Sequence, residues 1–341
     1  WETDSFRPRK PTVLEEVKRG LMVCEATWQV IPRLYRAGRE AMHMLESANE
    51  SEAQLPRGNF CRFGTWIGGD RDGNPLVTAD VTRATLRMLR RRALELHLDE
   101  CNAVIRTLSI SDRLHPSTKP MQDRLRRMRL RYEGLDEQLD RLNPHETYRM
   151  FLTAVRFRLR ATLVADPYHA QPAVAYNDHR ALLKDLNLVA RTLRDNGHAD
   201  FADSALMDWI DRTAACGFHL ARLDIREDSR RLNTAVDELA RCMGIEAGYD
   251  QLDEEAKQAV LSAPLASEAV DRLDPGELTE DTRETLRLFT LIDETAGTLG
   301  HEALGILIVS MTHHPSDVLA PLWLSRLAAV LRQDKDEPIA L

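Results

Sequence analysis

The residues best suited to chemistry lie in one short stretch, "GGDRDGNP", at positions 68–75. Asp70 and Asp72 flank Arg71, and three glycines allow another part of the chain to approach the backbone closely. The glycines suggest a phosphate-binding loop, but the two carboxylates would repel an anion and no Gly-Lys-Ser or Gly-Lys-Thr sequence is present. We favour a carboxylate–arginine–carboxylate network that shapes a site. The alternative is a tight turn held by local side-chain hydrogen bonds.

A second segment, "LDIREDS", contains the best candidate for an anion ligand, Arg226. A guanidinium group binds phosphate or carboxylate through two parallel hydrogen bonds. If the segment is a strand, Leu223 and Ile225 share one face, and Asp224 and Arg226 share the other. We expect the apolar face to meet helices and Arg226 to point toward a site. A purely structural pair between Arg226 and Asp224, or between Arg226 and the next residue, is the alternative.

The third segment, "SMTHHPSD", follows another apolar run. Ser310 ends that run and is expected to face the same site. The two adjacent histidines are poorly placed to hold one metal ion, and Ser316 or Asp317 is expected to cap a helix that begins near Val318. His219, in the preceding segment, is expected to be a packed residue. No set of residues has the spacing of a metal site.

Three strands must position these residues, and we predict them near residues 63–69, 218–226 and 305–311. Each is followed by a helical pattern, which is typical of parallel βα units. Sites in such folds are built where the strands end. The long intervals between the strands require large helical insertions, so the predicted class is α/β and strongly helix-rich.

Hydrophobic periodicity predicts helices over residues 12–28, 79–108, 143–163 and 182–193. Thr12 and Glu15 have the spacing of a capping box. The sequence "NPHE" that begins at Asn143 is a typical helix start, and Gly197 is a plausible stop. Arginine-rich runs at 90–92 and 124–131 are expected to be solvated helix faces.

Composition limits the class of protein. The 341 residues are 43% hydrophobic and carry a net charge of −8, which argues against a nucleic-acid surface. The five cysteines are scattered, which argues against a disulfide framework or a zinc ribbon and favours the cytoplasm. No apolar run is long enough to cross a membrane and no signal peptide is present. Because the chain starts at Trp1 rather than at Met, we expect it to be a piece of a longer protein.

Five stretches together resemble the phosphoenolpyruvate carboxylase family. They are "KPTVLEEVKRGL", "FGTWIGGDRDGNPLVT", "NPHETYRMFLTAVRFRL", "LDIREDSRR" and "VSMTHHPSDVLA". The resemblance spans nearly the whole chain. It implies a helix-decorated (β/α)8 barrel, of which this chain would supply strands two to four within a single domain over 1–341.

The resemblance also implies an activity. The family adds bicarbonate to phosphoenolpyruvate, which gives oxaloacetate and phosphate, and it uses Mg2+ or Mn2+ in a homo-oligomer that is expected to be a tetramer. Arg226 and Arg71 would be the catalytic residues here. The residues expected to contact substrate are Arg226, Gly68, Gly69, Asp70, Asp72, Asn74 and Ser310.

The chain departs from the family pattern in two places. Glu227 stands where the family usually has Gln, and Leu232 stands where His is usual. The family's catalytic histidine is expected before Trp1, and its metal-binding carboxylates and arginine–glycine loop after Leu341. We therefore expect the isolated chain to be inactive. A non-catalytic helical scaffold or a small-anion-binding paralogue is the alternative.

Overall fold

The structure of this protein is a computed structural model that describes residues 10–48 and 60–333. Expectations that rest on the first nine and last eight residues lie outside this described part. The predicted helix-rich α/β class is confirmed, with one small parallel sheet. The elements are α1 (Val13–Ala48), β1 (Gly64–Thr65), α2 (Ala79–Thr107), α3 (Lys119–Arg131), α4 (Leu135–Leu139), α5 (Thr147–Val164), α6 (His179–Asp195), α7 (Ala199–Ala202), α8 (Ala205–Cys216), β2 (Arg222–Asp228), α9 (Ser229–Cys242), α10 (Glu254–Ser262), α11 (Ser267–Val270), α12 (Glu280–Thr298), β3 (Leu304–Ser310) and α13 (Pro315–Gln333).

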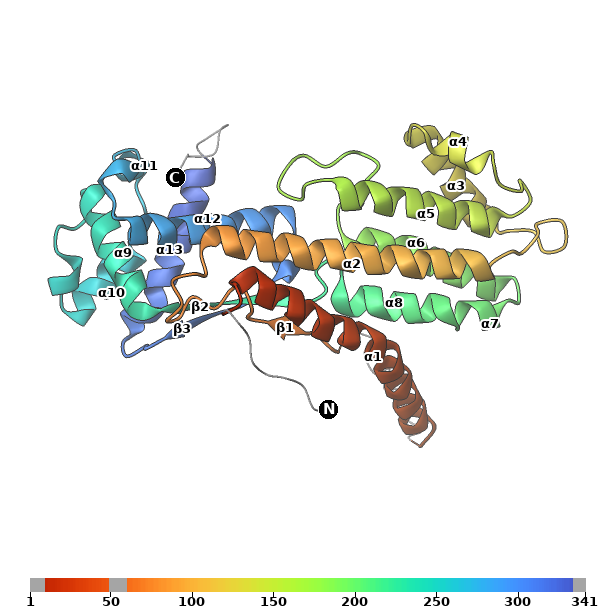
Figure 1. Cartoon of the computed structure of the whole chain (residues 1–341), viewed down its shortest axis with the longest axis horizontal. Coiled ribbons are helices and arrows are strands. Elements are labelled where there is room, and N and C mark those ends of the chain that lie inside the picture. The colour runs from red at the N-terminus through yellow and green to blue at the C-terminus, as the bar shows by residue number, and fades with distance from the viewer. Residues whose placement is uncertain (1–9, 49–59, 334–341) are drawn as a thin grey trace. The chain divides into compact units, whose positions relative to one another are not determined.

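The chain divides into two compact units. Unit 1 comprises residues 1–20, 64–86 and 222–341, and unit 2 comprises residues 21–63 and 87–221. Helices α1 and α2 contribute residues to both, so each unit combines segments that are far apart in the sequence. In Figure 1, the cyan-to-blue helices α9 to α13 belong to unit 1, and the yellow-to-green helices α3 to α8 belong to unit 2.

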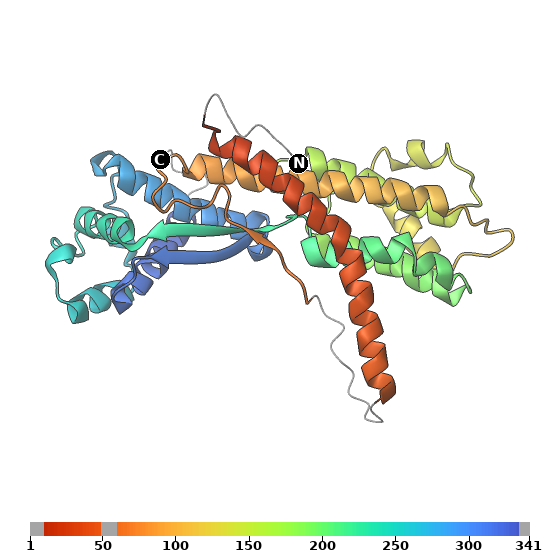
Figure 2. The same cartoon turned by 60° about the horizontal axis from the view of Figure 1, so that its bottom comes forward.

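Unit 1 contains the sheet, whose strands run parallel in the order β1-β2-β3. Figure 2 shows the central strand β2 lying beside β3. Ile225 pairs with Leu307, and Asp228 with Ser310, so these two strands end at the same level. Each strand leads into a helix (α2, α9 and α13), which confirms the predicted βα order.

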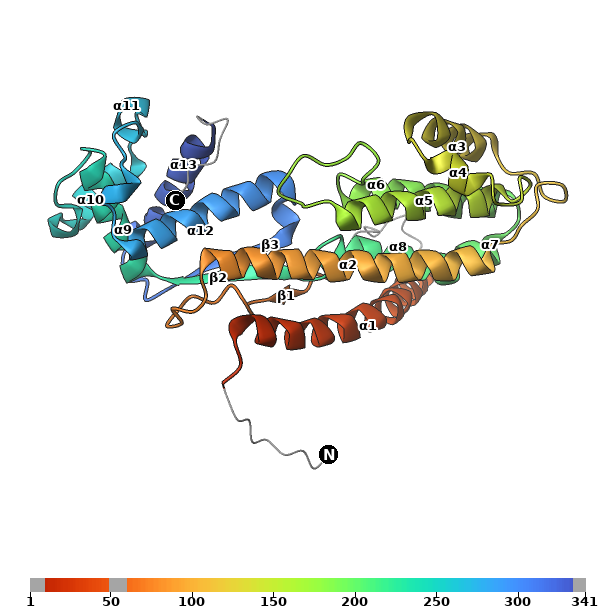
Figure 3. The ribbon, with the colours of Figure 1, turned by 45° about the horizontal axis from the view of Figure 1, so that its top comes forward.

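One face of the sheet is covered by helices of unit 1. Leu307 and Val309 of β3 pack against a core to which α9, α12 and α13 contribute, with Trp323 fully buried in it. Figure 3 shows these three helices grouped together. On the other face of β3, Ile306 and Ile308 are 67% and 39% exposed. Alternation of side chains thus produces one covered face and one open face.

The predicted alternation along the second strand is confirmed. Leu223 and Ile225 are buried on the covered face. Asp224 and Arg226, on the open face, are only partly covered. The burial of apolar side chains on one face is what directs Arg226 to the other.

The first and third strands differ in extent from the prediction. β1 has two residues, where a strand was predicted over 63–69, because the chain turns after Trp66, whose carbonyl accepts a hydrogen bond from the Gly69 N–H over 2.9 Å. β3 begins and ends one residue earlier than the predicted 305–311.

The second strand begins later than the predicted 218–226. Residues 218–221 form a turn instead, in which Leu220 has a φ of 61°, a backbone conformation that no strand residue adopts. His219 lies in this turn rather than in a strand. Its side chain is buried, as expected of a packed residue.

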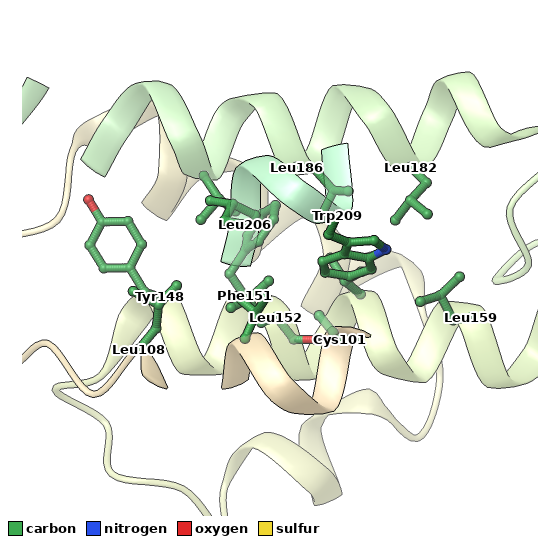
Figure 4. Packing of buried hydrophobic residues seen from close by; sticks show 14 of the residues in the cluster. Cys101, Leu108, Tyr148, Phe151, Leu152, Leu159, Leu182, Leu186, Leu206 and Trp209 are labelled. Carbon is green, nitrogen blue, oxygen red and sulfur yellow. Dashed lines mark hydrogen bonds between the residues drawn. The ribbon is translucent and has the colours of Figure 1, made fainter. Parts of the chain in front are cut away.

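Unit 2 is built around an apolar core between helices. Figure 4 shows Phe151 and Leu152 of α5 with Leu186 of α6 and Leu206 of α8 in this core. The indole of Trp209 lies beside them and is fully buried. The predicted stripes of α5 and α6 therefore meet in this packed core, whereas Trp28, Ala93 and Leu96 belong to a second apolar cluster. Packing of this kind is the main source of stability for such a bundle.

Two predicted helix ends are confirmed by their hydrogen bonds. The Glu15 N–H donates to Thr12 Oγ1 over 3.3 Å, and the Thr12 N–H donates to Glu15 Oε2 over 2.9 Å, which is the reciprocal capping box. Gly197 has a φ of 78°, and the His198 N–H donates to the Leu193 carbonyl over 2.8 Å. These features are the usual glycine stop of a helix.

The start of α5 was placed too early by the sequence. The helix begins at Thr147 rather than at Asn143. The Asn143 side chain accepts a hydrogen bond from the His145 N–H over 3.0 Å and donates to Glu146 Oε1 over 3.2 Å. "NPHE" is therefore a separate turn before the helix, because the Asn side chain bonds locally instead of capping the helix.

The prediction that the arginine run at 90–92 is solvated is wrong for Arg90. Its relative exposure is 7%, whereas the Arg91 side chain is 75% exposed. Arg90 lies on the same face of α2 as the buried Leu86 and Ala93, at helical spacings of four and three residues. Consecutive residues of a helix point about 100° apart, so one of three adjacent arginines can fall on the buried face while the others face water.

Candidate functional site

The loop that contains "GGDRDGNP" is attached to the C-terminal end of β2 by backbone hydrogen bonds. The Arg226 N–H donates to the Gly69 carbonyl, and the Arg71 N–H donates to the Arg226 carbonyl, both over 2.9 Å. Asp70 is therefore paired with Arg226 in parallel register. Since side chains alternate along extended segments, Asp70 and Arg226 face one way while Arg71 and Glu227 face the other.

The two glycines predicted to contact substrate are required by packing. A Cβ atom on Gly69 would collide with the carbonyl oxygen of Asp224, so only glycine allows the loop to approach β2 this closely. Gly68 has a φ of 90°, and a Cβ there would overlap the side chain of Thr85. Thr82 Oγ1 donates to the Gly68 carbonyl over 2.9 Å. The glycines thus hold the loop between β2 and α2.

Arg226 and Asp70 form a partly exposed ion pair at the end of β2. Arg226 Nη1 lies 3.3 Å from Asp70 Oδ2, and the two side chains are 40% and 32% exposed. Arg226 Nε and Asp70 Oδ1 are buried atoms that have no hydrogen-bond partner within residues 10–48 and 60–333. A long, single ion pair leaves most of the guanidinium donors free for an anion. The two residues are brought together as the sequence predicted for a site at the strand ends.

Arg71 is on the covered side of the sheet. Its Nε donates to Glu227 Oε2 over 2.8 Å and its Nη1 donates to Glu284 Oε1 over 2.9 Å. The residue is 1% exposed, so the carboxylate–arginine–carboxylate network is present, but its carboxylates are not the flanking aspartates. Glu284 Oε1 also accepts the Ala79 N–H over 2.6 Å. This network joins the loop to β2, α12 and the start of α2.

Glu284 could not have been identified from the sequence. It lies in α12 between Arg283 and Arg287, in a helix whose charged residues are otherwise typical of a solvated face. Its side chain is 16% exposed, and its partner Arg71 is 213 residues away along the chain. No local spacing distinguishes it from its charged neighbours.

Glu227 faces away from the candidate site. Besides Arg71, it lies near Arg231, whose Nη1 is 3.3 Å from Oε1, and it accepts the Asp228 N–H over 3.1 Å. Its carboxylate is therefore neutralised by two arginines and hydrogen-bonded, as a fully buried carboxylate must be. Glu227, which stands where the family usually has Gln, therefore does not place its charge on the face where Arg226 lies. Leu232, the other departure from the family pattern, is fully buried in the apolar core.

Asp72 and Asn74 lie in the turn that closes the loop. Both are partly buried. Asn74 Oδ1 accepts the Leu76 N–H over 3.2 Å, which is the local side-chain bond expected of a tight turn. The hydrogen bond that Arg230 donates to Asp228 is the largest cause that raises the pKa of Arg230, and the nearby charge of Asp72 raises it further.

Ser310 lies at the C-terminal end of β3. Its hydroxyl donates to the Glu227 carbonyl over 3.4 Å, and it pairs in register with Asp228. Ile308, two residues earlier, is the register partner of Arg226. Ser310 therefore lies at the same edge of the sheet as Arg226, with a hydroxyl that already has a backbone partner.

The third motif forms a helix start that differs in detail from the prediction. α13 begins at Pro315, three residues before Val318. Asp317 Oδ2 accepts the N–H groups of His313 and His314 over 2.8 and 2.9 Å. Burial opposes ionisation of Asp317, but these hydrogen bonds prevail and lower its pKa. Asp317 thus stabilises the helix start from inside the first turn, not from the cap position.

Carboxylates around Arg226 do not provide a metal site in the part of the chain that the structure describes. Asp70, Asp72, Asp224 and Glu227 do not offer three ligand atoms close enough together to hold one ion. In the described ranges, moreover, no helix is long and apolar enough to cross a membrane.

Comparison with known proteins gives a consistent family. A family model described as phosphoenolpyruvate carboxylase matches residues 1–340. The chain is 35% identical to the phosphoenolpyruvate carboxylase of Roseiflexus castenholzii over 97% of its own length and 36% of that protein. It is 34% identical to that of Rhodothermus marinus, with 98% and 35% covered. The chain thus spans about a third of the length of these relatives. It belongs to the phosphoenolpyruvate carboxylase family.

Proposed function

We propose that this chain is part of a phosphoenolpyruvate carboxylase and that Arg226 binds an anionic group of phosphoenolpyruvate. The observation that carries this proposal is the position of Arg226 at the C-terminal end of β2, with its side chain 40% exposed and held by a single carboxylate, Asp70. Ligands bind at the carboxyl ends of strands in parallel α/β folds. Membership of the family supplies the reaction.

The chemistry requires positive charge around the substrate. Phosphoenolpyruvate carries a phosphate and a carboxylate, and its carboxylation by bicarbonate gives oxaloacetate and phosphate. Arg226 would grip one of the anionic groups through two hydrogen bonds and offset its charge during the reaction. Asp70 would orient the guanidinium. In this proposal Gly68, Gly69, Asp72, Asn74 and Ser310 shape the surrounding surface.

We assign Arg71 a positioning role instead of the catalytic role expected from the sequence. Its guanidinium is buried between Glu227 and Glu284, so an anion has no access to it. By anchoring the loop to β2, it fixes the backbone pairing of Asp70 with Arg226. Arg71 would therefore act on the substrate only through these two residues.

The remaining features of the proposal follow from the family. The three strands would be strands two to four of a (β/α)8 barrel in a single helix-decorated domain. Mg2+ or Mn2+, which would stabilise negative charge on the reacting substrate, would be held by residues outside this chain. The parent would be a cytoplasmic homo-oligomer, a tetramer by resemblance, without a nucleic-acid partner. The isolated chain would not form oxaloacetate.

Steady-state kinetics of the full-length parent test the role of Arg226. Arg226→Ala should lower kcat/KM for phosphoenolpyruvate by at least about 100-fold, the loss expected when a charged hydrogen bond to substrate is removed. Arg226→Lys should recover part of it, because the charge remains but the bidentate geometry is lost. Arg241→Ala is the matched control, since Arg241 is 57% exposed near the end of α9. Normal kcat/KM in Arg226→Ala would refute the assignment.

The non-catalytic alternative depended on Glu227 and Leu232. Glu227 is neutralised by arginines on the covered face, and Leu232 is part of the apolar core. Neither residue alters the charge on the side where Arg226 lies. The structural reasons for preferring a non-catalytic scaffold therefore disappear.

A further inference from the structure

Arg90 is a buried cation that forms no ion pair with the described part of the chain. Its relative exposure is 7%. Across residues 10–48 and 60–333, no carboxylate lies within ion-pairing distance of its guanidinium, and it takes part in no hydrogen bond. It stands out on α2, where Arg87, Arg91 and Arg92 all form ion pairs with acidic side chains.

The neighbours of Arg90 in unit 2 are aromatic rather than acidic. The Arg90 guanidinium carbon lies 5.8 Å from the centre of the Phe218 ring. Tyr168 is close enough to interact electrostatically with it. Arg87, one turn earlier on α2, is paired with Asp166 over 2.8 Å and lies over the Tyr168 ring. Asp166, the acidic residue in this group of contacts, is therefore paired with Arg87 and not with Arg90.

These aromatic contacts do not compensate for the burial of the charge. Removing an arginine from water is expensive unless it gains a carboxylate or several hydrogen bonds. A cation over an aromatic ring near 6 Å recovers only part of that cost. The burial of Arg90 lowers its pKa to about 10, so the group stays charged at neutral pH. A charged donor is thus largely buried, and no protein group among the described residues accepts a hydrogen bond from it.

We propose that Arg90 is the centre of an anion-binding site in unit 2, and that its ligand is a small oxyanion of the phosphate or carboxylate class. A guanidinium group has five N–H donors in a planar fork that matches such ligands. Buried side-chain atoms without partners include the Nη2 of Arg71 and the Nε of Arg226, but no nitrogen of Arg90. Because the Arg90 nitrogens also make no hydrogen bond within the described residues, they must keep some contact with solvent, and it is from that side that the proposed ion would bind.

This proposal is independent of the carboxylase activity, because Arg90 and Arg226 belong to different units. A methionine at position 90 would fill a similar volume without a charge.

Isothermal titration calorimetry on the intact chain with inorganic phosphate tests the proposal, at constant ionic strength with chloride as the balancing ion. Wild-type protein should bind phosphate saturably, and Arg90→Met should weaken binding at least ten-fold. Arg91→Met is the matched control and should bind as wild type does, because Arg91 is 75% exposed. A parallel titration with acetate distinguishes a carboxylate ligand from a phosphate ligand. Saturable binding of either ion that depends on Arg90 supports the site.

Stability provides a second readout. In phosphate-free and acetate-free buffer, Arg90→Met should unfold at a higher urea concentration than wild type, because it removes an unpaired buried charge. A saturating oxyanion should raise the wild-type midpoint and leave that of Arg90→Met unchanged. If neither anion binds the wild-type chain, or if Arg90→Met binds with the wild-type affinity, the proposal is overturned.

Discussion

Arg71 and Glu227 form an ion pair whose two side chains have no exposed surface, with Arg71 Nε 2.8 Å from Glu227 Oε2. The residue that precedes each of them, Asp70 or Arg226, belongs to the half-exposed pair on the opposite face. Because side chains alternate on either side of the Asp70–Arg226 bridge, Arg71 and Arg226 point to opposite faces of the sheet. One is fixed inside the fold, and the other remains available to a ligand.

The buried pair should contribute strongly to stability. Replacing Glu227 by Met leaves the Arg71 charge with Glu284 alone, and the free energy of unfolding should fall by about 3–5 kcal/mol. Glu227→Gln keeps an acceptor and should cost less, about 1–3 kcal/mol. Urea unfolding followed by circular dichroism measures both. Glu280→Gln, which removes a surface partner of Arg283, should leave the midpoint unchanged. Equal effects of the buried and surface variants would contradict the assignment.

A Cβ atom at Gly69 should break the contact between the loop and β2. Gly69→Ala places a methyl group against the carbonyl oxygen of Asp224, and neither backbone can move without losing the pairing with Arg226. We expect a loss of more than about 2 kcal/mol in unfolding free energy. Gly73→Ala is the control: its φ is 69°, but it meets nothing within 4 Å, so strain alone should cost about 1–2 kcal/mol. The prediction fails if Gly73→Ala is the more damaging change.

His97 should make unit 2 less stable in acid. The ring is fully buried, accepts a hydrogen bond at Nδ1 from Trp209 Nε1 over 3.0 Å, and lies 2.8 Å from the Gly217 carbonyl at Nε2, which therefore carries the proton. Burial lowers the pKa of His97 to about 4, against 6.5 when unfolded. Above pH 6.5 both states are neutral. As the pH falls from 6.5 toward 4, only the unfolded state gains the proton, and about 3 kcal/mol of stability is lost.

Urea unfolding between pH 7 and pH 4 checks this dependence. His97→Gln should be less stable at pH 7 but should show a shallower decline with falling pH. His169→Gln is a suitable comparison, because the His169 side chain is 77% exposed. A decline of the same slope in His97→Gln and wild type would assign the pH dependence to other groups.

Asp185 should be the most sensitive polar residue of unit 2. Its carboxylate accepts hydrogen bonds from Arg158 Nη1 over 2.9 Å, from the Tyr176 hydroxyl over 2.9 Å and from Arg124 Nε over 3.0 Å. Asp185→Asn leaves the buried Arg158 without its counter-charge and should cost about 3–5 kcal/mol. Thermal and urea unfolding measure the loss. Asp136→Asn, at a 56% exposed partner of Arg129, should change little.

Much of the candidate site was accessible to sequence reasoning because it depends on local order. The alternation of Leu223 and Ile225 with Asp224 and Arg226 places Arg226 on the open face, as observed. The glycine-rich loop was expected at the end of a strand, and it lies there. Helix stripes and the capping box at Thr12 follow from spacing alone, and they are confirmed.

The residues that sequence reasoning misplaced depend on contacts between distant segments. Arg71 was expected to act beside the substrate. The pairing of Asp70 with Arg226 instead directs the Arg71 side chain to the opposite face, where it contacts Glu284 of α12. Arg90 was expected in solvent, yet the packing of α2 buries it. Helix starts at Asn143 and Val318 were displaced because side chains bonded the backbone at neighbouring positions.

The sequence by itself determined the family, the βα order, the two arginine-bearing motifs and the face on which Arg226 lies. Only the tertiary structure decided that Arg71 is buried between two glutamates, that Glu227 is neutralised, and that Arg90 is buried without an ion pair among the described residues. Periodicity and spacing are local properties of the chain, so they predict which face a side chain takes. Burial and ion pairing depend on which distant segment packs against that face, and this information is not contained in any one segment.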